Sequence, residues 1–200
     1  MHFALRRFIL FTLCAVAGGV TSVSAQSFST ASRRVTPSVF VGVTGVSTGL
    51  DSGRNLSITA GVDLAFRPDS QWQPALEYRA MYAVDKGGVD SLKNNLGGVK
   101  VSGHYSHIRP YVDLLAGRGE TTYANGGYQV PNKLVFYTQS ASNVFSFGGG
   151  ADVFAIGNLA LKLDLQMQRY SSPVTVSGSL YSETGTVGLV YVFHPGRTTQ

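Results

Sequence analysis

The sequence contains little that would stabilise an exported protein by cross-linking or bind it to a polyanion. Its only cysteine, Cys14, lies in the N-terminal segment. Charged residues make up 14% of the chain, and the excess of 16 basic over 11 acidic residues is small. The basic residues are scattered, which excludes the basic stripe of a nucleic-acid-binding surface. No apolar run after Ala25 approaches the roughly 20 residues of a membrane-spanning helix. Glycine, tyrosine and phenylalanine are abundant instead, with 24, 10 and 11 residues.

The N-terminus has the pattern of a cleaved export signal. Arg6 and Arg7 precede an apolar run over residues 8–20, and small residues follow as far as Ala25. We interpret residues 1–25 as a signal peptide, because the apolar run is too short for a membrane anchor. The exported chain then has no cysteine, so something other than disulfides must stabilise it.

Apolar and polar side chains alternate along most of the remaining chain. Leu56, Ile58 and Val62 share one face of the segment 55–67, and Leu161, Leu163 and Leu165 share one face of 159–168. A period of two is typical of β-strands. Weaker copies of the pattern occur at 72–82, 99–105, 111–116, 145–153 and 186–193. A further strand is expected at about 38–47, but it is apolar on both faces and its orientation stays open.

These segments predict a transmembrane β-barrel. Strands of about 9–11 residues cross a bilayer, and only helices or closed barrels satisfy their backbone there. The connections also alternate between short turns and longer stretches, as expected for short periplasmic turns and long extracellular loops. We therefore predict an all-β fold, an eight-stranded antiparallel up-and-down barrel over residues 37–193. Residues 26–36 and 194–200 are expected to form periplasmic segments before and after it.

Aromatic residues gather at the ends of the predicted strands. Amphipathic rings are favoured at the two membrane interfaces, where one end is apolar and the other is wet. The girdle expected on the periplasmic side consists of Phe66, Trp72, Phe154, Tyr191 and Phe193.

Two segments resemble a known family. Residues 185–193, Gly-Thr-Val-Gly-Leu-Val-Tyr-Val-Phe, resemble the terminal strand that the barrel-assembly machinery recognises in outer-membrane barrels. Residues 109–112, Arg-Pro-Tyr-Val, resemble the middle of small barrels of the OmpA/OmpX type. The resemblance implies a location in the bacterial outer membrane, contact with its lipids and lipopolysaccharide, and insertion by that machinery. Seven residues after Phe193 are too few for a peptidoglycan-binding domain, so it implies a bare barrel.

If the apolar faces meet lipid, the charged residues of the strands point inward. An eight-stranded barrel is just wide enough for side chains to fill, so these charges must pair. The set, which we call the interior charge network, contains Asp63, Glu77, Arg79, Lys100, Asp113, Asp152, Lys162 and Asp164. It predicts either a salt-bridged plug, which we favour, or a narrow polar pathway. We expect no metal site and no cofactor.

Three functions remain open on the sequence alone. The first is a structural or surface-interaction barrel, for which Tyr123, Tyr128 and Tyr137 of a long loop at 118–142 are candidate contacts at the surface. The second is a small porin. The third is a lipid-modifying enzyme similar to lipid A deacylases, because His104 and Ser106 would share one face of a strand. We favour the first and expect no catalytic residues.

Overall fold

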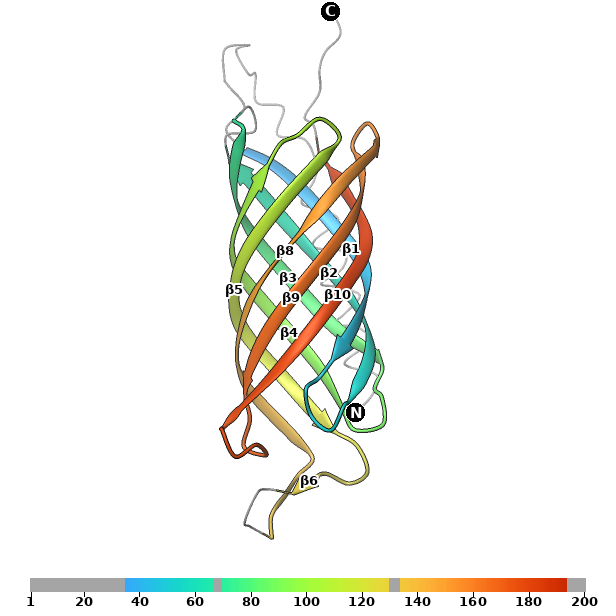
Figure 1. The fold of residues 1–200 in the computed structure, drawn as a ribbon, viewed down its shortest axis with the longest axis vertical. Coiled ribbons are helices and arrows are strands. Elements are labelled where there is room, and N and C mark those ends of the chain that lie inside the picture. The colour runs from blue at the N-terminus through green and yellow to red at the C-terminus, as the bar shows by residue number, and fades with distance from the viewer. Residues whose placement is uncertain (1–34, 67–69, 130–133, 194–200) are drawn as a thin grey trace, which may run out of the picture. The chain divides into compact units, whose positions relative to one another are not determined.

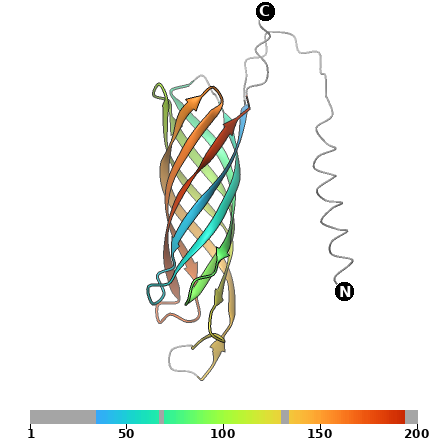
Figure 2. The ribbon, with the colours of Figure 1, turned by 90° about the vertical axis from the view of Figure 1, so that its right-hand side faces the viewer.

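The computed structural model describes residues 35–66, 70–129 and 134–193. Eight antiparallel strands form a closed barrel in which each strand pairs with its neighbour in the chain order and β1 pairs with β10 (Figures 1 and 2). The barrel strands are β1 (Val35–Ser47), β2 (Arg54–Phe66), β3 (Trp72–Asp85), β4 (Asp90–Gly103), β5 (Ile108–Tyr123), β8 (Gln139–Ile156), β9 (Leu159–Ser171) and β10 (Ser179–Val192). The predicted fold class is confirmed.

The two ends of the barrel differ in the length of their connections. The end that holds Val35 and Val192 also holds turns such as residues 157–158, and we call it the short-turn end. The opposite, long-loop end carries the connections 48–53, 86–89, 124–138 and 172–178. A two-stranded hairpin of β6 (Tyr128–Gln129) and β7 (Phe136–Tyr137) extends from this end (Figure 1).

The strands run further toward the long-loop end than the sequence pattern predicts. The loop expected at 118–142 was too long, because β5 reaches Tyr123 and β8 starts at Gln139, and β4 already begins at Asp90, before the alternation expected from Val99. These strand ends are rich in Ser, Thr and Asn and lack a clear apolar face. Backbone pairing holds them in the sheet, since Asp90 is opposite Tyr123 and Thr122 is opposite Gln139.

Outward-facing positions in the middle of the barrel strands are mostly apolar and exposed. β9 alternates without interruption between exposed and buried residues from Leu159 to Ser171. Large apolar side chains such as Leu165, Phe145 and Val187 remain 71%, 61% and 56% exposed on the outer surface. The orientation predicted for the seven alternating segments agrees with these exposures.

The orientation of β1, which the sequence left open, is set by Phe40. Phe40 points into the barrel and is buried, whereas Val41 and Val43 are on the outer face. A side chain at Gly61, on the adjacent strand β2, would collide with the Phe40 ring and with the Tyr78 carbonyl oxygen. Glycine at position 61 therefore provides the space into which the ring packs.

The signal peptide expected at 1–25 and the tail expected at 194–200 lie outside the described residues, as do residues 26–34 of the segment before the barrel. The barrel itself begins at Val35, two residues before the expected Pro37. Within the described ranges, no helix is long and apolar enough to cross a membrane.

Candidate functional site

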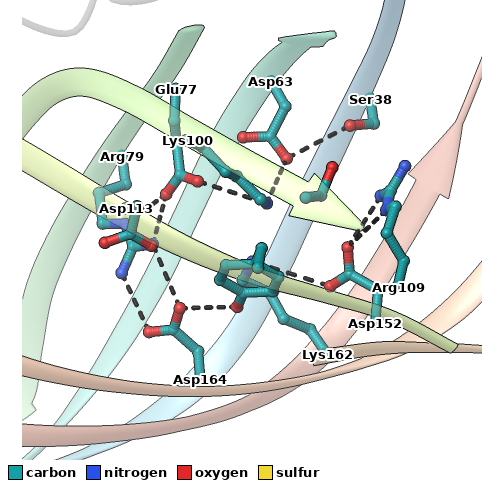
Figure 3. A network of polar contacts seen from close by, with 12 residues as sticks. Ser38, Asp63, Glu77, Arg79, Lys100, Arg109, Asp113, Asp152, Lys162 and Asp164 are labelled. Carbon is teal, nitrogen blue, oxygen red and sulfur yellow. Dashed lines mark hydrogen bonds and ion pairs between the residues drawn. The ribbon is translucent and has the colours of Figure 1, made fainter. Parts of the chain in front are cut away.

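The interior charge network occupies the half of the barrel nearer the short-turn end. All eight predicted members are buried, and the structure brings them together in one connected cluster (Figure 3). They come from β2, β3, β4, β5, β8 and β9, and each reaches the interior because it occupies an inward position of its strand.

Arg79 joins three carboxylates at the centre of the network. Its Nε donates to Glu77 Oε1 at 2.6 Å, and its Nη1 donates to Asp164 Oδ1 at 3.0 Å. Its Nη2 donates to Asp113 Oδ2 at 3.3 Å. The planar guanidinium presents several donors in a fixed fork, so one arginine can bridge carboxylates from three strands.

Lys100 lies between Asp63 and Glu77, the latter of which Arg79 also contacts. Asp63 and Glu77 are directly opposite each other on β2 and β3. Lys100 Nζ lies 3.1 Å from Asp63 Oδ2 and 3.4 Å from Glu77 Oε2. The ammonium also lies 4.0 Å from the centre of the Tyr111 ring, where the ring face attracts a cation.

Arg109 is a ninth member of the network, which the sequence analysis missed. Its Nη2 donates to Asp152 Oδ2 at 2.8 Å, and the two residues are direct partners across β5 and β8. Lys162, the expected partner of Asp152, lies further away, with Nζ 3.8 Å from Oδ1. The period of two counted back from Asp113 through Tyr111 predicts an inward side chain at position 109, but the alternating segment was expected to begin only at Tyr111.

With Arg109 included, five acids face four bases, which leaves a formal excess of one negative charge, 5 − 4 = 1. Neutral groups add hydrogen bonds to the acids: Tyr111 Oη donates to Asp164 Oδ2 at 2.7 Å, and Gln166 Nε2 donates to Asp113 Oδ2 at 3.0 Å. No set of three His, Cys, Asp or Glu side chains in the described ranges is arranged to hold a metal ion. The arrangement is that of a packed ionic core.

A second, apolar layer fills the interior toward the long-loop end, and nothing in the sequence analysis predicted it. We call it the apolar inner layer; it contains Val46, Leu50, Met81, Leu92, Leu96, Leu115, Tyr123, Val144, Tyr170, Val174 and Leu180. Leu50 and Val174 belong to the connections 48–53 and 172–178, so these two loops fold inward over the mouth of the barrel. The interior is thus filled at two successive levels.

The expected aromatic girdle is only partly on the outer surface. Trp72, Tyr191 and Phe193 are exposed there, at 58%, 44% and 43%, and Phe66 is half-buried. Phe154 was assigned wrongly: it packs against the buried cluster around Phe40, and the Arg109 guanidinium lies 5.2 Å from its ring centre. Its position two residues after Asp152 turns it inward.

The three loop tyrosines also differ from one another. Tyr123 is not a surface contact, because it is the last residue of β5 and is buried in the apolar inner layer. Tyr128 is half-buried and donates to Asp51 Oδ2 at 2.6 Å, and this hydrogen bond raises the pKa of Tyr128. Only Tyr137 is clearly exposed, at 39%.

His104 and Ser106 do not share the face of a strand. β4 ends at Gly103, and Ser106 lies in a turn with a φ of 51°. The Ser106 hydroxyl is 2.9 Å from Nδ1 of His107, the neighbouring residue. The expected His-x-Ser arrangement needs an extended backbone, which this turn interrupts.

No protein-family model matches the chain, and neither does any curated protein. Among solved structures, it is similar to Neisserial surface protein A, with 12% identity, 80% of this chain and 97% of that chain covered, and a TM-score of 0.49. It is also similar to Ail, the attachment invasion locus protein of Yersinia pestis, with 12% identity, 80% and 98% covered, and a TM-score of 0.45. A third is the N-terminal β-barrel domain of Pseudomonas aeruginosa OprF, with 17% identity, 78% and 97% covered, and a TM-score of 0.38. The functional proposal below therefore rests on the geometry of this barrel.

Proposed function

We propose that the protein is an integral barrel of the bacterial outer membrane whose interior is closed and whose role is structural or lies in surface interaction. The observation that carries this proposal is the pairing of an apolar outer surface with an interior filled by two layers of side chains.

The outer surface supports a lipid environment. Val43, Val112, Leu163 and Val187, from four different strands, are between 44% and 56% exposed. Soluble monomers rarely expose contiguous apolar patches larger than a few hundred Å². A membrane barrel instead presents an apolar band of this kind to lipid and keeps its charges inside.

The interior argues against a porin. A porin needs a continuous polar path, but the interior charge network is followed by the apolar inner layer and by two inward-folded loops. An eight-stranded barrel is just wide enough for its side chains to fill, so an interior packed at both levels leaves no open aqueous route. The remaining role is at the surface, and the exposed apolar residues Leu134, Phe136 and Val176 beyond the barrel are the candidate contacts with an extracellular partner.

The proposal also includes partners. Outer-membrane lipids and lipopolysaccharide would surround the apolar belt, and the barrel-assembly machinery would insert the chain. In support of insertion, β10 is an unbroken strand that pairs with β1 to close the barrel and is followed by the exposed Phe193.

Membrane fractionation and heat modifiability test the location. We expect the protein in the outer-membrane fraction, and we expect the unboiled barrel to migrate differently from the boiled chain in a detergent gel. Recovery as a soluble periplasmic monomer with identical migration before and after boiling would contradict the proposal.

A further inference from the structure

The outer surface of the barrel carries an apolar groove in the half nearer the long-loop end. It crosses β4, β5, β8 and β9, reaches β10 and has a volume of about 440 Å³. Gly97 and Ala116, which are direct partners on β4 and β5, form a shallow floor. The exposed aromatic side chains of Phe145 and Phe147 on β8 border this floor, and the exposed Tyr181 on β10 lines the surface beyond β9. A groove with a small-residue floor and an aromatic border suits an extended hydrocarbon chain.

A polar cup of similar volume, about 440 Å³, lies on the same strands and closer to the long loops. Arg118, Ser140, Asn143 and Ser171 line it. The strand register relates the two cavities: Arg118 is opposite Asn143, and Phe145, two residues further along β8, is opposite Arg169. The cup therefore continues the groove toward the long-loop end along the outward face of β5, β8 and β9.

Two arginines mark the boundary between the cavities. Arg118 lines the cup and donates to Asn143 Oδ1 at 3.1 Å, and Arg169 lines the groove and donates to Ser179 Oγ at 3.0 Å. In the described part of the chain, neither arginine forms an ion pair with a carboxylate. β5 and β9 are two strands apart, about 10 Å, and the register places Arg169 two residues, about 7 Å, nearer the short-turn end than Arg118. The two long side chains can reach one extended headgroup from these positions. Guanidinium groups are well suited to bind phosphate.

We propose that this surface binds one phosphorylated glycolipid of the lipopolysaccharide class, with an acyl chain in the groove and headgroup phosphate at Arg118 and Arg169. The inference rests on the proposed membrane location, which places the long-loop half of the barrel in the outer leaflet. Charge complementarity selects an anionic lipid, because Arg118 and Arg169 have no carboxylate partner among the described residues. Two acidic side chains lie nearby: Glu120, two residues beyond Arg118 on β5, is already paired with Lys93, and Glu183 is opposite Met167, one step toward the short-turn end from Tyr181. The hydroxyl and amide groups of the cup provide partners for sugar hydroxyls.

Substitutions separate the two parts of the site. Arg118→Gln with Arg169→Gln removes the phosphate partners and leaves the groove. Arg54→Gln with Lys86→Gln, at the same end of the barrel, removes the same charge elsewhere. Gly97→Leu fills the groove without a backbone clash, because a Cβ at residue 97 would meet only the Glu77 carbonyl oxygen, at 3.9 Å. Gly45→Leu is the matched control, since a Cβ at residue 45 meets nothing within 4 Å.

The test is binding of lipid A to the purified, folded barrel in detergent, followed by native mass spectrometry, with phosphatidylglycerol and phosphatidylethanolamine as comparison probes. We expect one retained lipid A per barrel, with affinity lowered about tenfold or more by the double arginine substitution. Gly97→Leu should weaken binding severalfold, and both control variants should bind as the wild type does. All variants must first show heat-modifiable migration, because this property reports folding of the barrel independently of lipid binding.

The site would be overturned if the double arginine variant and Gly97→Leu both bound lipid A as tightly as the wild type. It would also be overturned if the control variants lost as much affinity as these variants. Neither result would affect the proposed membrane barrel. Equal affinity for phosphatidylglycerol would overturn the assignment to a glycolipid. A wild-type protein that never folds into a heat-modifiable barrel would instead overturn the proposed function on which the site depends.

Discussion

Arg109 and Asp152 are direct partners on adjacent strands inside the barrel, and Arg109 Nη2 donates to Asp152 Oδ2 at 2.8 Å. Lys93 and Glu120 are partners of the same kind on β4 and β5, with Nζ 2.8 Å from Oε1, but their side chains are 46% and 23% exposed. The two ion pairs differ mainly in burial, because the Asp152 side chain is fully buried.

We therefore expect the two pairs to differ in coupling energy. A double-mutant cycle with Arg109→Met and Asp152→Asn should give a coupling free energy of about 1–3 kcal/mol. The same cycle with Lys93→Met and Glu120→Gln should give less than about 1 kcal/mol, because water screens an exposed pair. Urea unfolding of the barrel in lipid vesicles measures both coupling free energies. Equal values would contradict the finding that Arg109 and Asp152 are shielded from water.

Lys100→Ala tests how strongly the network depends on a single ammonium group. Without the ammonium, the carboxylates of Asp63 and Glu77 remain opposite each other with one neutralising partner fewer. Removal of one partner from a buried ion pair destabilises a protein by about 3–5 kcal/mol. Lys93→Ala is the exposed control and should cost less than about 1 kcal/mol. Equal unfolding free energies for the two variants would show that Lys100 is solvated.

Leu163→Arg tests which face of β9 meets lipid. Leu163 is on the outer surface near the middle of the strand, and we expect the substitution to destabilise the folded barrel by about 2–4 kcal/mol. Leu159→Arg makes the same change on the same face at the first residue of β9, where the loss should fall to about 0–1 kcal/mol. If folding into vesicles shows no difference between the two positions, the proposed lipid belt is wrong.

Gly61→Ala tests how tightly Phe40 fills the interior. The added methyl group would collide with the Phe40 ring and the Tyr78 carbonyl oxygen, and overpacking of this kind costs about 1–3 kcal/mol. Gly45→Ala adds the same group in open space on β1 and should change stability by no more than about 0.5 kcal/mol. Thermal unfolding followed by the loss of heat-modifiable migration distinguishes the two variants.

The alternation of side chains predicted most of the architecture, because lipid and the barrel interior select opposite residue types at successive positions. Leu161, Leu163 and Leu165 of β9 show this most clearly, with buried polar residues between them. The rule failed in β1, where Phe40 and Val46 are inside and valines are outside, so both faces are apolar.

The composition of the interior was harder to predict than its orientation. Tyr123 was predicted as a surface-loop contact, yet it packs in the apolar inner layer together with Tyr170. Residue type alone does not separate a ring that meets lipid from a ring that fills the lumen. Arg109 was missed because it stands between a turn and Pro110, where the alternation has just begun.

The central claim is that the barrel is closed, and the conductance of the purified wild-type protein in a planar bilayer tests it most directly. With the interior charge network and the apolar inner layer both intact, we expect folded protein to insert without steady conductance. A large, stable current that scales with salt concentration would contradict the account, because it requires a continuous aqueous path through both layers.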